Sequence, residues 1–99
     1  MAVATYEIFF RGLPDDSSKE VSDFADRLKQ VSNTLLADCV ESIKGPFFHP
    51  NGKPWSMAIS FHDSVSCTQR TLHVLGTEIK RIREDMKKPP GFISRITVR

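Results

Sequence analysis

The chain has 99 residues, of which 39% are hydrophobic and 26% charged, with a formal net charge of +2 at pH 7. This length and composition predict one domain, residues 1–99, that folds alone around a single core like an ordinary soluble protein. No apolar run approaches the length of a membrane span, and the first residues lack the blocks of a signal peptide, so we expect a cytoplasmic protein without membrane contacts.

The charge is unevenly spread along the chain. Residues 1–50 carry five Lys and Arg against eight Asp and Glu, net −3, whereas residues 51–99 carry nine against four, net +5. The small total does not indicate a nucleic-acid binder, and the basic second half is interpreted first as a solvated helix face.

The sequence contains two cysteines, Cys39 and Cys67. In a reducing compartment, buried free thiols are the expected state of such a pair. We therefore predict no disulfide.

The first half of the chain predicts a central strand and a helix. Residues 6–14 are rich in aromatic and apolar side chains that fit a pleated sheet, and Gly12 and Pro14 end the strand. Ser17 and Glu20 have the spacing of a capping box, which predicts the start of a helix over 17–35. Its apolar residues recur at spacings of three and four: Val21, Phe24, Ala25, Leu28, Val31 and Leu35.

The middle of the chain predicts an edge strand, a protruding hairpin loop and a half-buried strand. From residue 38 the pattern has period two, with Cys39, Glu41 and Ile43 on one side and Val40, Ser42 and Lys44 on the other. Asn51-Gly52 and three prolines predict a loop over 45–55. The next strand alternates between Trp55, Met57, Ile59 and Phe61 and the small or polar Ser56, Ala58, Ser60 and His62.

The last third predicts a long helix and a terminal strand. Asp63 or Ser64 can cap the helix, and Pro89-Pro90 must stop it. Its predicted buried stripe is Val65, Thr68, Leu72, Leu75, Ile79, Ile82 and Met86. In the final strand, Phe92, Ser94, Ile96 and Val98 alternate with Ile93, Arg95, Thr97 and Arg99.

The order strand, helix, strand, strand, helix, strand predicts an α+β fold, the ferredoxin-like βαββαβ plait. Its four-stranded antiparallel sheet has the order 4-1-3-2, with two helices on one face. The predicted core is Ile8, Phe10, Val21, Phe24, Leu28, Ile59, Phe61, Leu72, Leu75, Ile79 and Ile82. The predicted open face carries Glu7, Phe9, Arg11, Ser56, Ala58, Ser60, Arg95, Thr97 and Arg99.

Residues 8–14 have the sequence Ile8-Phe9-Phe10-Arg11-Gly12-Leu13-Pro14. They resemble the first-strand signature of the RNA recognition motif, which implies that Phe9 stacks on a base. The element order agrees with that family over the whole chain. In the third strand the two usual stacking aromatics are replaced by Ser56 and Ala58, so the resemblance implies the fold more than RNA binding.

No pattern of catalytic residues emerges, and we expect neither enzymatic activity nor a cofactor or metal. His49, His62 and His73 lie on different elements without metal-ligand spacing. An acylphosphatase would share the fold and size, but its phosphate-cradling loop is not recognisable in residues 11–14.

Two functions remain, and the first is favoured. In the first, the chain binds a protein partner, or a second copy of itself as a homodimer, through the flat patch of Ser56, Ala58 and Ser60 with Phe9 as an apolar anchor. In the second, it binds single-stranded RNA or DNA. That reading uses Phe9 for stacking, Arg11, Arg95 and Arg99 for phosphates, and Phe47, Phe48, Trp55 and Lys53 as a clamp.

Overall fold

A computed structural model describes residues 2–11 and 18–99. Its elements are β1 (Val3–Phe10), α1 (Ser18–Leu35), β2 (Val40–Phe48), β3 (Pro54–His62), α2 (Val65–Asp85), the 3-10 turn η1 (Pro90–Phe92) and β4 (Ile93–Val98). The strands pair antiparallel in the order β2-β3-β1-β4, which confirms the predicted ferredoxin-like plait. The predicted turn at Gly12 and Pro14 and the predicted cap at Ser17 lie outside the described residues.

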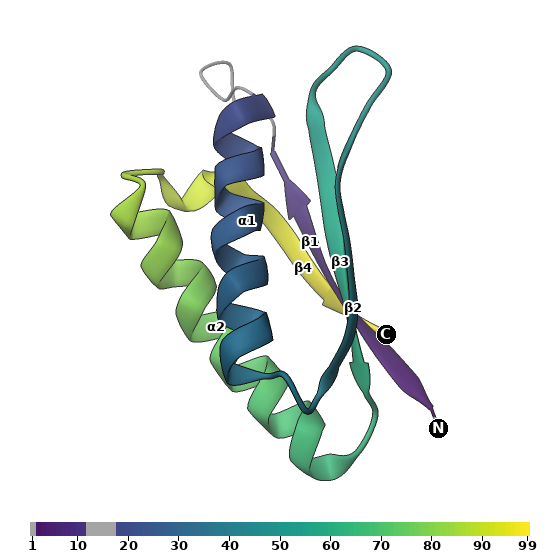
Figure 1. The fold of residues 1–99 in the computed structure, drawn as a ribbon. Coiled ribbons are helices and arrows are strands. Elements are labelled where there is room, and N and C mark those ends of the chain that lie inside the picture. The colour runs from purple at the N-terminus through teal and green to yellow at the C-terminus, as the bar shows by residue number, and fades with distance from the viewer. Residues whose placement is uncertain (1, 12–17) are drawn as a thin grey trace.

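Both helices cover the same face of the sheet (Figure 1). Strand alternation turns Ile8 and Phe10 of β1 toward the helices, where both are buried. At one end of this core the rings of Phe10, Phe24 and Phe92 meet edge to face, with centroids 5.4–5.8 Å apart. Of the residues predicted as core, Leu72 alone is not buried, and Leu35, which was predicted in the core-facing stripe of α1, is also exposed.

The prediction for Leu72 was wrong because the apolar stripe of α2 has a different phase. The residues of α2 that are buried are Thr71, Leu75, Ile79 and Ile82. Leu72 follows Thr71 by about 100° around the helix, so it lies on the flank of this stripe. Its side chain is 40% exposed. Val65, which was also placed in the stripe, is exposed as well.

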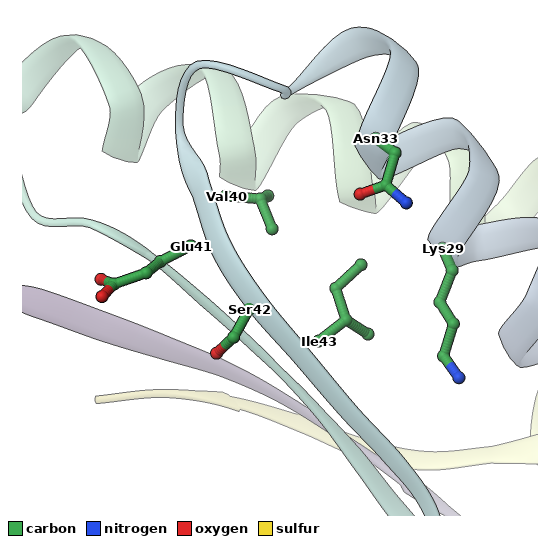
Figure 2. A pocket seen from close by; sticks show the side chains of 6 residues that line it. All are labelled: Lys29, Asn33, Val40, Glu41, Ser42 and Ile43. Atoms are coloured by element: carbon green, nitrogen blue, oxygen red, sulfur yellow. The ribbon is translucent and has the colours of Figure 1, made fainter.

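Strand β2 is irregular, and the predicted alternation of Val40 and Ser42 was wrong. Val40 pairs with Phe61 and Ile43 with Ile59, and both pack against the core, because the register shifts between Val40 and Ser42. Figure 2 shows Val40 and Ile43 pointing toward α1, while Glu41 and Ser42 point to the other side.

The β2–β3 hairpin is more regular near its end than predicted. Pairing continues as far as Phe48 and Pro54, so only residues 49–53 form the tip, where the sequence predicted a loop over 45–55. Gly52 has φ +85°, and the side chain of Asn51 accepts a hydrogen bond from the amide of Lys53 at 3.0 Å. The hairpin extends past the helices (Figure 1).

Helix α2 begins as predicted and ends earlier than the prolines require. The Ser64 side chain caps it by accepting a hydrogen bond from the amide of Cys67 at 3.2 Å. The helix ends at Asp85, and Lys87 then takes a positive φ of 58° while the amide of Lys88 donates to the carbonyl of Arg83.

The prediction of two free thiols was wrong, since Cys39 and Cys67 form a disulfide. Cys39 precedes β2 and Cys67 lies in the first turn of α2, and the fold brings their Cα atoms to 5.4 Å. The prediction followed from the expected compartment alone, whereas proximity is set by the tertiary structure. Beside the disulfide, Arg70 donates to Asp38 at 2.7 Å, and this hydrogen bond lowers the pKa of the Asp38 carboxyl.

The core assignment predicts that Leu75→Ala costs about 2–5 kcal/mol in the free energy of unfolding, because it leaves a cavity at a fully buried position. Leu72→Ala removes the same atoms from the exposed flank and should cost about 1 kcal/mol or less. Urea denaturation of both variants gives the comparison. Equal losses would contradict the observed phase of α2.

The disulfide predicts that reduction lowers the free energy of unfolding by about 2–4 kcal/mol, because it releases a link across 28 residues. Denaturation with and without dithiothreitol measures this loss, and the double variant Cys39→Ser/Cys67→Ser should show none. A folded chain that keeps two reactive thiols in oxidised glutathione would contradict the pairing.

Candidate binding face on the open side of the sheet

The face of the sheet opposite the helices is organised in rows that cross the four strands. Strand register places Arg95, Phe9, Ser56 and Phe47 next to one another, from β4 across β1 and β3 to β2. We call these four residues the aromatic row. Two rings therefore stand on this face, one on β1 and one on the edge strand β2.

Two further rows continue this face along the strands. The central row consists of Thr97, Glu7, Ala58 and Lys44, in the same strand order. The third row consists of Arg99, Thr5, Ser60 and Ser42. Arg99 directly follows β4. It belongs to the third row because Thr5 and Arg99 exchange backbone hydrogen bonds of 2.7 and 3.0 Å. In these two rows every side chain is small except Glu7, Lys44 and Arg99.

Phe9 is half-buried on the open face. The guanidinium of Arg95 lies over its ring, 4.3 Å from the centroid. Ser56 is only 3% exposed although it lies on the open face, since it is flanked by Phe9 and Phe47. Phe47 itself remains 43% exposed. The aromatic row thus presents an apolar ridge with a cation at one end.

The charges of this face are partly paired within the chain. The Arg99 guanidinium contacts the Glu7 carboxylate at 2.5 Å, and the carboxylate is much the less exposed of the two. Together with Phe9, Arg95 and Thr97 they line a shallow hollow of about 420 Å³. Lys44 is exposed at the β2 edge of the central row. The face therefore has a neutral centre with cations at its two edges.

Several residues predicted for the site lie elsewhere. Arg11 follows the end of β1, and its side chain lies beside Gly91, where an added Cβ would be 3.8 Å from its Nε. Phe48 packs against the core. Trp55 is exposed and stacks on His49 with ring centroids 5.2 Å apart.

The predicted hairpin clamp is therefore not assembled. Lys53 is exposed in the tip, and Phe47, Phe48 and Trp55 have three different surroundings. The open face instead includes four residues that sequence reasoning did not place there: Thr5 on β1, and Ser42, Lys44 and Phe47 on β2. The β2 residues require the register of that strand, which shifts between Val40 and Ser42, between Lys44 and Phe47, and between Phe47 and Phe48, and a simple alternation pattern does not reveal these shifts.

A second hollow, of about 350 Å³, lies between α1 and β2 (Figure 2). It is lined by Lys29, Asn33, Val40, Glu41, Ser42 and Ile43. The Ser42 hydroxyl and the Glu41 carboxylate both point away from α1, which carries Lys29 (Figure 2).

Within residues 2–11 and 18–99, no three His, Cys, Asp or Glu side chains are grouped so that they could hold a metal ion. No helix in the same part of the chain is both long enough and apolar enough to cross a bilayer. A scan against protein-family models and a search of curated proteins returned no match.

The position of Phe9 outside the core makes a direct prediction. Phe9→Ala should lower the free energy of unfolding by roughly 1 kcal/mol, because it mainly removes the contact with Arg95. Phe10→Ala, one residue along the same strand, should cost about 3–5 kcal/mol. Chemical denaturation of the two variants distinguishes the faces of β1, and a loss at position 9 as large as that at position 10 would place Phe9 in the core.

Proposed function

We propose that this chain is a non-catalytic binding module that recognises a protein partner through the open face of its sheet, with the β2–β3 hairpin at the rim. The observation that carries the proposal is the aromatic row. Phe9 and Phe47 stand on either side of a buried serine, on a face that neither helix covers. Aromatic and arginine side chains at the centre of small neighbours are typical of residues that anchor protein interfaces.

The small residues next to the aromatic row support the same proposal. Ala58, Ser60 and Thr5 are half-buried and rise little above the sheet. A flat protein surface can approach them closely, with sheets about 10 Å apart when the partner is also a sheet. The Phe9 and Phe47 rings stand above these small side chains, so they fit a partner surface that has a hollow opposite them.

The pairing of charges argues against single-stranded nucleic acid on this face. A base can stack on Phe9 only if the Arg95 guanidinium leaves the ring. Arg99 is already paired with Glu7, and the Glu7 carboxylate repels phosphate. Two of the three arginines assigned to phosphates thus have partners within the chain, which favours a protein ligand.

Site-specific photocrosslinking tests the proposal. A benzophenone side chain at position 58, at the centre of the open face, should yield protein adducts in an extract of the source cells. The same group at position 72, on the exposed flank of α2, serves as the matched control and should yield far fewer. Unlabelled wild-type chain should compete for the position-58 adduct, whereas Phe9→Ala should compete at least tenfold less well if Phe9 is an interface anchor.

Fluorescence anisotropy with labelled single-stranded RNA and DNA at 50 and 200 mM salt provides the complementary measurement. We expect no affinity that depends steeply on salt. Salt-dependent binding that is lost in Arg95→Ala would overturn the proposal in favour of a nucleic-acid ligand. Equal competition by wild type and Phe9→Ala would show that Phe9 is not an anchor, and adducts as abundant from position 72 as from position 58 would show that the open face is not the binding surface.

A further inference from the structure

We infer that the protein partner is a second copy of this chain, docked face to face about a two-fold axis that runs parallel to the strands between β1 and β3. The inference rests on the proposed function, since it names the partner of the same face. This axis exchanges β4 with β2 and β1 with β3, and it keeps every row at its own level. Each row therefore faces the same row of the partner copy in reverse order.

In the aromatic row, this exchange places one ring against a small side chain and the other ring against a cation. Phe9 of one copy faces Ser56 of the other, whose side chain is low and buried between its neighbours. Arg95 faces Phe47, an exposed ring at the opposite edge of the sheet. The Arg95 guanidinium, which already lies over the Phe9 ring of its own chain, would then also contact the Phe47 ring of the partner copy.

In the central row, the exchange brings no like charges together. Glu7 faces Ala58 of the partner copy and lies one strand away from its Lys44. Lys44 faces Thr97, which is uncharged. In the third row, Arg99 faces Ser42 and Thr5 faces Ser60. The open face is thus complementary to itself in charge and in side-chain size.

The other two-fold arrangement lacks this complementarity. An axis perpendicular to the strands, along the central row, would keep each strand opposite its own copy. Lys44 would then face Lys44 and Glu7 would face Glu7 across the interface. Like charges directly opposite one another are destabilising, so the parallel axis is favoured.

The size of the face sets the affinity range. Four strands about 4.8 Å apart and seven paired positions of about 3.3 Å give a face of roughly 20 by 23 Å, or roughly 900 Å² for the two copies together. Interfaces below about 1,200 Å² are typical of weak association. Dimerisation should therefore appear at micromolar to millimolar concentrations.

Sedimentation equilibrium over that range, with two charge variants and their combination, tests the inference. Lys44→Glu loses the attraction to Glu7, and Thr97→Lys places a lysine opposite Lys44. Because each contact occurs twice in the dimer, each variant should weaken association by roughly fivefold or more. The double variant puts lysine opposite glutamate at both places, so it should dimerise more tightly than either single variant.

Ile96→Lys is the matched control, because it adds the same charge to the adjacent position of β4 on the helix side of the sheet, where Ile96 is exposed. It should leave the dissociation constant unchanged. A double variant weaker than both single variants, or a dimer lost through Ile96→Lys, would overturn this arrangement. A wild-type chain that remains monomeric at 1 mM would overturn self-association alone, because the position-58 crosslinks judge the open face independently.

Discussion

The structure depends on the pairing of β1 with a neighbour on each side, antiparallel to β3 and to β4. Its backbone hydrogen bonds are satisfied within the sheet, so its side chains are fixed alternately to the two faces. Ile8 and Phe10 are held in the core with the helices, and Phe9 is held on the open side. A slip of one residue would exchange these roles and place Glu7 in the core, which makes the register costly to change.

This constraint links stability to the candidate function. The helices bury one face and leave the other to residues that contribute little to the core. The Phe9 ring lies under the Arg95 guanidinium and beside Ser56, and Phe47, on the other side of Ser56, stays substantially exposed. Such side chains add little to the core, and burial against a partner would give them the larger part of their stabilisation.

The fold and most of the core followed from periodicity, because a strand's alternation and a helix's apolar stripe are local properties of the sequence. The errors involved relations that are not local. The phase of α2 depends on how it packs on the sheet, so Leu72 was placed inside. Cys39 and Cys67 meet only because the start of β2 lies against the first turn of α2. The place of Phe47 depends on register shifts in β2 that no repeat pattern reveals.

The most direct test of the central claim is an isotope-filtered nuclear Overhauser experiment on a mixture of labelled and unlabelled chains, at a concentration where the dimer is populated. It observes only contacts between two copies. We expect contacts from the Phe9 ring to the Ser56 methylene, and from the Arg95 side chain to the Phe47 ring. Contacts between copies that arise instead from Leu72 or Ile96, on the other side of the sheet, would contradict it.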